Sequence, residues 1–341
     1  MKHKDNNKLT FGIIGYGRFG SLWATHLSTL GTVFVFDTKN KVTDKTPHII
    51  SASLQETVAV DIVFLAVPMS ELQNCCEKIS PLLSPQTLVV DVCSIKTWPI
   101  TIMKKCLPKK QPILATHPLF GPDSAKMNGG IKGLKIVVCP TKREGVFGKK
   151  LLEIFKKLQL NIIIATARQH DQQMANSQAL MHFIGRSLAN LKLGQQDIST
   201  PSYDNLVRMC QTVNNDTLQL FFDMQTKNPF ASIVRDKFVH DVGALNESIM
   251  LQDDTLQGLR SHIEKIDRTI IRLLSTRMKI VKKIGVLKQV QGIAVVDPNR
   301  EAQLKDLHRK YSEHDKIDYE FISNIFNVVI NHARAAQHKN I

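Results

Sequence analysis

Apolar and polar positions divide this 341-residue chain into three zones. Between Leu9 and about Arg168, short runs rich in Val, Ile and Leu alternate with amphipathic stretches, a pattern typical of a parallel sheet covered by helices. The runs that we assign to strands are LTFGIIG, VFVFD, DIVFLAVP, TLVVDVCS, PILATHP, LKIVVCP and NIIIATA. The first zone is therefore predicted to be an α/β domain over residues 8–168.

The other two zones follow helical periodicity. From about Gln169 to Met250 the strand pattern ends, and apolar residues recur at helical spacing with breaks near STPSY and KNPF. After QDD, residues 256–291 contain no proline, and a last amphipathic helix is expected from about Asp318 to Gln337. We therefore expect two all-α domains, over residues 169–252 and 253–341.

Composition narrows the class of protein. The apolar runs are too short to span a bilayer, and the polar, basic start MKHKDNNK does not have the pattern of a secretory signal. The six cysteines lack metal-ligand spacing, which predicts reduced thiols in a cytoplasmic protein without a metal site. The formal charge of +15 would suit nucleic acid, but Lys and Arg are scattered without interleaved aromatic residues. An anionic small molecule is an equally good partner, and we expect no nucleic-acid or membrane partner.

A glycine motif follows the first predicted strand. Gly15, Gly17 and Gly20 have G-x-G-x-x-G spacing before an amphipathic segment, which permits a tight turn and close approach of a pyrophosphate. The second predicted strand ends at Asp37, whose carboxylate can bind both ribose hydroxyls and would repel a 2′-phosphate. This order predicts a Rossmann-type domain that binds NAD, and Lys39 keeps NADP as the alternative. The residues that we assign to the cofactor site are Gly15, Tyr16, Gly17, Arg18, Phe19, Gly20, Asp37 and Val67.

Two polar side chains follow later strands of the predicted sheet. Ser94 lies in DVCSIK and His117 in THPLFGPD, so both are expected at the carboxyl ends of strands, where ligands of such sheets bind. A lone histidine after a strand is more often a structural hydrogen-bonding residue. Here Pro118 and FGPD predict a stiff turn that faces the glycine loop, which favours a catalytic role for His117.

From about Lys8 to Met250 the chain resembles the prephenate dehydrogenase family. The resemblance rests on GYGRFG, DVCSIK, THPLFGPD, and RQHD followed by QALMHF. It implies NAD-dependent oxidative decarboxylation of prephenate to 4-hydroxyphenylpyruvate, a step of tyrosine biosynthesis. It also implies that His117 is the hydrogen-bond acceptor and base, that Ser94 is its partner, and that His182 is a second substrate-site histidine.

One position departs from that family. Its carboxylate-binding arginine falls on Thr212 here, and Arg208, one helical turn earlier, could supply the charge. A solvated helix arginine is an equally good interpretation of Arg208. The choice between prephenate and arogenate as substrate therefore stays open.

An apolar stripe runs along the long helix that is predicted from Leu256. Its positions are Leu259, Ile263, Ile266, Ile270, Leu273, Ile280, Ile284 and Leu287. Arg277 lies on this stripe, and Arg260 and Lys288 border it. Because unpaired buried cations are costly, the stripe indicates an anionic ligand inside a helical bundle. An exposed coiled-coil edge explains the cations equally well.

Residues 256–337 resemble the all-helical chorismate mutase family, and they align without a gap. The resemblance implies that Arg260, Arg277, Asp297 and Arg300 bind chorismate, that Lys288 and Gln337 stabilise charge on the breaking ether oxygen, and that Glu301 accepts from the ring hydroxyl. A well-known member has a serine where this chain has Ala333. In that family the first arginine crosses from a partner subunit, so Arg260 implies a homodimer.

Two other functions fit parts of the sequence. One is a different NAD enzyme, such as a hydroxy-acid dehydrogenase, with a merely structural helical tail; the HPLFGPD motif argues against it. The other is a basic helical module that binds nucleic acid and is fused to a sensor of NAD, which predicts affinity that falls steeply with salt. The sequence predicts nothing about feedback by tyrosine, channelling, or an oligomer beyond the dimer.

Overall fold

The computed structural model describes residues 9–39 and 46–338. The start of the chain, where we expect no secretory signal, lies outside these residues. The chain divides into two compact units, Met1–Asp241 and Val242–Ile341. The boundaries after residues 168 and 252 that the sequence suggests remain predictions.

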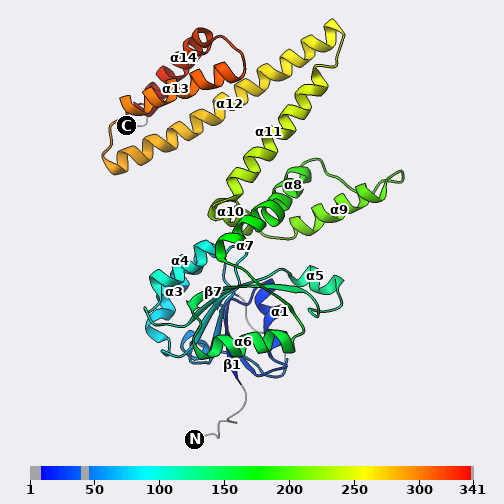
Figure 1. Ribbon diagram of the computed structural model, residues 1–341, viewed down its shortest axis with the longest axis vertical. Coiled ribbons are helices and arrows are strands. Elements are labelled where there is room, and N and C mark those ends of the chain that lie inside the picture. Colours follow the sequence, from blue (N-terminus) through cyan, green and yellow to red (C-terminus); the bar gives the residue numbers. More distant parts are fainter. Residues whose placement is uncertain (1–8, 40–45, 339–341) are drawn as a thin grey trace, which may run out of the picture. The chain divides into compact units, whose positions relative to one another are not determined.

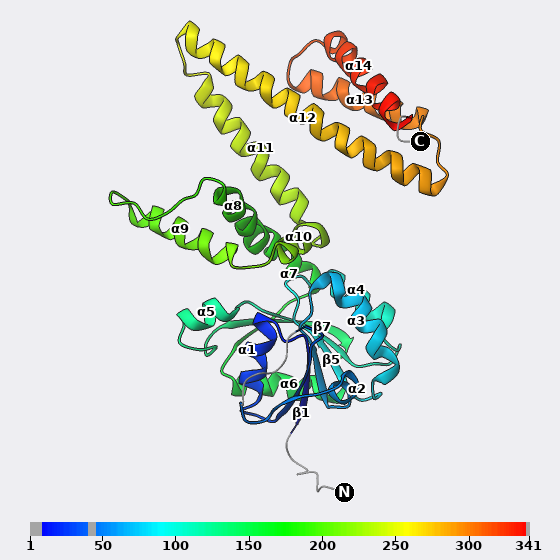
Figure 2. The ribbon, with the colours of Figure 1, turned by 180° about the vertical axis from the view of Figure 1, so that it is seen from behind.

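An eight-stranded sheet forms the centre of the first unit, in the order β3-β2-β1-β4-β5-β6-β7-β8 (Figures 1 and 2). The strands are β1 (Thr10–Ile14), β2 (Thr32–Phe36), β3 (Ile49–Ser51), β4 (Ile62–Leu65), β5 (Leu88–Asp91), β6 (Ile113–Pro118), β7 (Lys135–Arg143) and β8 (Asn161–Ile164). The order reverses between β1 and β4, which both follow the same direction. Such a switch point is where open α/β sheets bind their ligands.

The sheet differs from the predicted one in two respects. Strand β3 was not predicted, because it is only three residues long and mostly exposed. The expectation of a uniformly parallel sheet is wrong at β7, which pairs with β6 in antiparallel register. The chain turns back at the carboxyl end of β6 through the short helix α5 (Pro122–Met127), instead of crossing the sheet.

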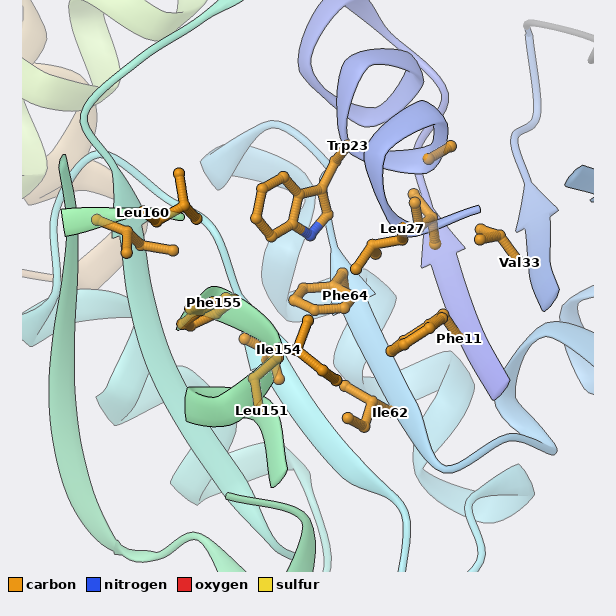
Figure 3. Packing of buried hydrophobic residues seen from close by; sticks show 14 of the residues in the cluster. Phe11, Trp23, Leu27, Val33, Ile62, Phe64, Leu151, Ile154, Phe155 and Leu160 are labelled. Carbon is orange, nitrogen blue, oxygen red and sulfur yellow. The ribbon is translucent and has the colours of Figure 1, made fainter. Parts of the chain in front are cut away.

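Helices cover both faces of the sheet. They are α1 (Arg18–Leu27), α2 (Leu54–Val58), α3 (Leu72–Ile79), α4 (Thr97–Cys106) and α6 (Gly145–Lys157), with short 3-10 turns η1 (Met69–Glu71) and η2 (Ser80–Leu82). Helices α1 and α6 enclose a core centred on Trp23, whose ring meets the edge of Phe64 at 5.7 Å and lies 6.0 Å from Phe155 (Figure 3). A second core on the opposite face includes residues of α2, α3 and α4.

Helices alone follow β8 along the chain. They are α7 (Ala167–Met174), the π-helical turn η3 (Ala175–Ala179), α8 (Leu180–Ala189), α9 (Pro201–Asn214), α10 (Leu218–Lys227) and α11 (Ala231–Met250). The hydroxyls of Thr166, Thr200 and Thr217 cap α7, α9 and α10 by accepting from backbone N–H groups of the first turn. The predicted breaks at STPSY and KNPF coincide with the start of α9 and the end of α10.

The second unit contains α12 (Leu256–Gln291), α13 (Pro298–His314) and α14 (Tyr319–His338). Thr255 caps the start of α12, and Gly292 ends it in a left-handed conformation with φ of 67°. Both views show α13 and α14 along the carboxyl-terminal half of α12 (Figures 1 and 2). Among the described residues, no helix has the length and apolar character needed to cross a membrane.

Candidate active sites

The glycine loop between β1 and α1 is shaped for close backbone contact. Gly15 has φ of +102°, and a Cβ there would lie 2.5 Å from the Ala66 carbonyl oxygen and 3.2 Å from the Val67 nitrogen. A Cβ on Gly20 would lie 2.0 Å from the Gly15 carbonyl oxygen. Gly17, in contrast, has no atom within 4 Å of its Cβ position, and no side chain caps α1. The loop therefore leaves room beside the start of α1, where a pyrophosphate can approach.

The other residues of the predicted cofactor site surround this loop. The Asp37 carboxylate, directly after β2, accepts from the Tyr16 backbone N–H at 2.6 Å and from that of Lys39 at 2.7 Å. Phe19 points into the core and stacks on Trp23 at 5.8 Å. Arg18 is half exposed and forms an ion pair with Asp123 at 2.7 Å. The side chains of Asp37 and Arg18 thus both lie at the glycine loop.

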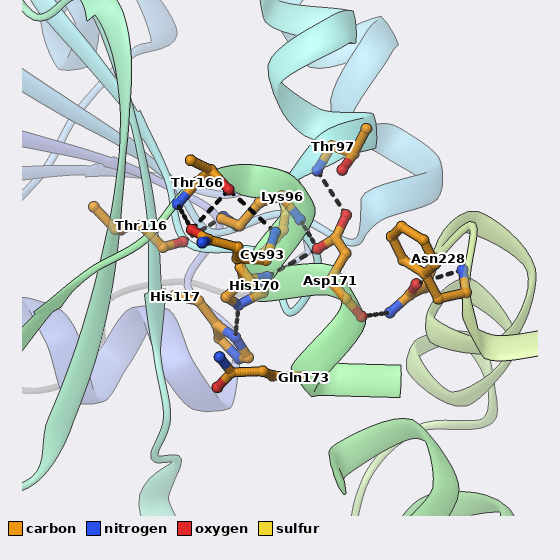
Figure 4. Close-up of polar contacts among 12 residues, drawn as sticks. Cys93, Lys96, Thr97, Thr116, His117, Thr166, His170, Asp171, Gln173 and Asn228 are labelled. Carbon is orange, nitrogen blue, oxygen red and sulfur yellow. Dashed lines mark hydrogen bonds and ion pairs between the residues drawn. The ribbon is translucent and has the colours of Figure 1, made fainter. Parts of the chain in front are cut away.

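A chain of three polar side chains lies at the carboxyl end of β6 (Figure 4). His117 is 3% exposed, and its Nδ1 lies 2.9 Å from Nε2 of His170 on α7. His170 Nδ1 lies 2.8 Å from Oδ1 of Asp171. The Asp171 carboxylate accepts in turn from the backbone N–H groups of Lys96 at 2.7 Å and Thr97 at 2.8 Å, at the start of α4.

These contacts determine the tautomers of both histidines. Burial acts to raise the pKa of Asp171, but hydrogen bonds from His170, Thr97 and Lys96 outweigh it and lower that pKa, so the carboxylate is ionised. Burial lowers the pKa of His170 and, further, that of His117, so both rings are neutral near pH 7. Asp171 then accepts from His170 Nδ1–H, and His170 Nε2 accepts from His117 Nδ1–H. The lone pair of His117 is left on Nε2, where it can accept a proton.

A buried ion pair supports the same region. Lys96 and Asp91 both have fully buried side chains, and the Lys96 ammonium donates to the Asp91 carboxylate and to the backbone carbonyl of Thr116. Burial raises the pKa of Asp91, an effect that the Lys96 charge opposes. The pair joins the end of β5 to the residue before His117.

The other residues predicted for the dehydrogenase site differ in burial and in their contacts. Ser94 is half buried beyond β5, and no hydrogen bond joins it to His117 within the described residues. His182 on α8 is buried, and its Nε2 lies 3.7 Å from the Asp216 carboxylate. Arg208 and Thr212 are both exposed on α9, and Arg208 donates to Asn205 at 3.2 Å. The roles of these residues remain predictions.

In the second unit, three of the predicted mutase residues lie on α12 and α14. Arg277 Nη1 on α12 and Gln337 Oε1 on α14 are buried and have no hydrogen-bond partner among the described residues. Lys288, about three helical turns after Arg277 on the same face, donates from Nζ to the carbonyls of Ala294 at 3.0 Å and Val295 at 2.7 Å. A Cβ on Gly285 would lie 3.3 Å from Gln337 Cγ, so Gln337 lies against this part of α12.

The remaining predicted mutase residues are more exposed. Asp297 is the N-cap of α13 and accepts from the Arg300 backbone N–H at 3.0 Å. The Glu301 carboxylate is half buried and binds Arg334 on α14, with Arg334 Nε at 3.0 Å from Oε1. Arg260 and Arg300 have exposed side chains. The structure thus places Gln337 against α12 near Lys288, with Arg277 on the same face about three turns earlier, and leaves Arg260 exposed.

The sequence interpretation did not include His170 and Asp171 among the candidate site residues. Both lie in the RQHD segment, which contributed to the resemblance only as a pattern. The available signal was an ionisable pair directly after a predicted strand, at the same sheet edge as His117. The hydrogen bond between His170 and His117, which is 53 positions away, is visible only in the fold.

Three family models match the chain. Residues 37–164 match the nucleotide-binding domain of prephenate dehydrogenase. Residues 259–338 match chorismate mutase type II. Residues 187–270 match a TYRAAT1-like, C-terminal domain.

Individual proteins show the same two similarities. Arogenate dehydrogenase 1 of Arabidopsis thaliana is 25% identical over 245 residues, and the match covers 69% of this chain and 38% of that protein. A chorismate mutase of Methanocaldococcus jannaschii is 31% identical over 84 residues, which cover 25% of this chain and 85% of the relative.

A solved prephenate dehydrogenase from Aquifex aeolicus, in complex with hydroxyphenyl propionate and NAD+, shares the fold. Its TM-score is 0.57 at 17% identity, and the match covers 81% of this chain and 100% of that one. Residues 37–164 are thus similar to the nucleotide-binding domain of prephenate dehydrogenase, and over residues 259–338 the chain belongs to the type II chorismate mutase family.

Proposed function

We propose that this chain is a bifunctional enzyme of tyrosine biosynthesis. Its second unit rearranges chorismate to prephenate, and its first unit oxidises prephenate to 4-hydroxyphenylpyruvate and carbon dioxide with NAD. The observation that carries the proposal is the His117–His170–Asp171 chain, which presents a neutral histidine base at the edge of the sheet that also holds the glycine loop. The product of one reaction is the substrate of the other, which makes the fusion chemically coherent.

In the first unit, His117 can act as the proton acceptor of the reaction. His117 Nε2 would accept the proton of the ring hydroxyl, while Asp171 and His170 hold the ring in the required tautomer. NAD, when bound, accepts the hydride from the carbon that bears this hydroxyl. Loss of the ring carboxylate as carbon dioxide then makes the ring aromatic, so the protein has mainly to orient the substrate and polarise the hydroxyl.

The second unit needs no acid, base or nucleophile for its reaction. Arg277 would bind a carboxylate of chorismate and hold the compact reactive conformer. Lys288 and Gln337 would stabilise the negative charge that grows on the breaking ether oxygen. The buried atoms of Arg277 and Gln337 that have no hydrogen-bond partner support this assignment. Buried polar groups nearly always have such a partner, and a bound ligand would supply it here.

One assay tests both halves of the proposal. Incubating the protein with chorismate and NAD should produce NADH, and added prephenate should remove any lag before NADH appears. Arogenate should be assayed beside prephenate, because an arogenate dehydrogenase is among the similar proteins and Thr212 occupies the position of the family arginine. Absence of NADH with all three compounds would overturn the dehydrogenase, and unchanged chorismate would overturn the mutase.

Asp37 should select NAD over NADP. Asp37→Ser removes the carboxylate that would bind the ribose hydroxyls, and it also removes the acceptor for the Tyr16 and Lys39 N–H groups. We expect KM for NAD to rise about tenfold, the usual effect of losing one hydrogen bond to a charged group. The preference for NAD over NADP should become smaller. Steady-state kinetics with each cofactor measure this. A wild-type protein that already turned over NADP faster would refute the assignment and point to Lys39.

We further propose that two copies of the chain form a homodimer through α12. The apolar stripe of this helix is exposed in the single chain, with Ile263 at 58% and Ile270 at 49%. Arg260 and Lys288 lie roughly 40 Å apart along one helix at about 1.5 Å per residue, so Arg260 can complete a Lys288 site only in another copy.

Light scattering should give twice the 38.4 kDa of one chain, and Ile263→Asp with Ile270→Asp should lower both this mass and mutase activity. A wild-type monomer with full mutase activity would contradict the dimer.

We also retain a cytoplasmic location and the lack of a nucleic-acid partner as expectations.

A further inference from the structure

Three polar side chains lie about one turn apart along η3 and α8, and all have unpaired buried atoms. They are Gln178, His182 and Arg186, and the atoms without a hydrogen-bond partner in the described residues are Oε1, Nδ1 and Nε respectively. His182 is only 4% exposed. Native structures rarely leave buried polar groups unpaired, so three in succession indicate a face that receives a polar ligand.

Arg186 carries the positive charge on the face formed by Gln178, His182 and Arg186. Its Nη2 donates to the backbone carbonyl of Asp216, and its guanidinium lies 5.4 Å from the centre of the Phe221 ring. No ion pair involves Arg186 in the part of the chain that the structure describes, whereas Arg18 forms one with Asp123 at 2.7 Å. A partly buried guanidinium that is held by a carbonyl and an aromatic ring still has donors for an anion.

His182 does not supply this positive charge. Burial lowers its pKa, and the nearby Arg186 charge lowers it further against the opposing effect of Asp216. The ring is therefore neutral near pH 7 and can act only as a hydrogen-bonding group. Of Gln178, His182 and Arg186, only Arg186 therefore offers a positive charge to an anion.

The face is joined to the nucleotide loop. Arg18 donates from Nη1 to the Asn215 carbonyl at 2.9 Å, and the same atom lies 3.6 Å from the Asp216 carboxylate. Asp216, between α9 and α10, is also the residue whose carbonyl binds Arg186. Residues 215–216 thus connect the Arg186 face to the glycine loop, beside which the proposed cofactor and its substrate would lie.

We propose that Arg186 binds a carboxylate of the dehydrogenase substrate, beside His182. The inference rests on the proposed dehydrogenase function and assigns its substrate an anionic group in this place. Arg208, the other candidate cation, is exposed and donates to Asn205 on its own helix. Arg208 is the competing assignment for this contact, and the two assignments predict opposite results.

Steady-state kinetics with prephenate and saturating NAD test this proposal. Arg186→Gln should raise KM for prephenate at least about tenfold and change kcat less than about threefold, because an ion pair with a carboxylate already forms when the substrate binds, so that its loss weakens binding more than turnover. KM for NAD should stay unchanged. Arg208→Gln should leave both constants within about twofold. An unchanged KM for prephenate in Arg186→Gln, or the tenfold rise in Arg208→Gln instead, would overturn the proposal.

A variant that keeps the charge separates binding from folding. If Arg186→Gln unfolds at a lower temperature than the wild type, Arg186→Lys decides the question. A KM between those of the wild type and the Gln variant supports a bound carboxylate, and a KM equal to that of the Gln variant contradicts it. A wild-type protein that oxidises neither prephenate nor arogenate would refute the proposed function itself. An active enzyme whose KM for prephenate is unchanged by Arg186→Gln would refute only the role of Arg186.

Discussion

His117→Asn is expected to lower dehydrogenase turnover by at least about 100-fold, the usual scale of a lost general base. The asparagine side chain has no nitrogen that can accept the substrate proton, but its amide can still occupy the space beside His170. The rate of NADH formation from prephenate measures the effect. Mutase activity on chorismate should stay normal, because His117 lies in the first unit.

The pH dependence of the wild-type enzyme provides an independent check. A base acts in its neutral form, and burial lowers the pKa of His117 well below its ordinary value, with further lowering by His170 and Lys96. The ratio kcat/KM should therefore stay level as the pH falls to about 6.5, the ordinary histidine value, and decline only at lower pH. Near-normal NADH formation by His117→Asn, or a decline that begins above pH 6.5, would argue against His117 as the base.

Lys288→Ala should lower mutase turnover by at least about 100-fold, which corresponds to about 3 kcal/mol for one contact to developing charge. Negative charge appears on the ether oxygen mainly in the transition state, so turnover should fall more than affinity for chorismate. Conversion of chorismate measures both constants. Dehydrogenase activity on added prephenate should persist.

A matched control separates this role from a structural one. Lys282 is exposed on α12, about 120° around the helix from Lys288, and Lys282→Ala should leave mutase activity unchanged. Lys288 also donates to the Ala294 and Val295 carbonyls, so thermal unfolding of each variant should be compared. Loss of both activities together with the fold would make Lys288 a structural residue. Full mutase activity in Lys288→Ala would remove it from the site.

Local patterns in the sequence determined much of this protein. The glycine spacing predicts the loop that the structure places at the switch between β1 and β4, because the positive φ of Gly15 and the close approach of Gly20 to the Gly15 carbonyl arise within a few residues. Periodicity predicts α12 with its observed bounds, because Thr255 caps its start, Gly292 ends it, and no proline interrupts it. The carboxyl end of β6 likewise places His117 at the predicted edge.

Only the tertiary structure decided how distant groups meet. The direction of β7 depends on where the chain turns after β6, and alternation of side chains is the same for a strand that runs either way. The ring of His117 is oriented by His170, and Asp171 by backbone N–H groups 75 residues away at the start of α4. The environment of Arg186 depends on a loop between two other helices. Periodicity reports which face of an element is buried, but charge, tautomer and hydrogen bonding depend on what the fold brings to that face.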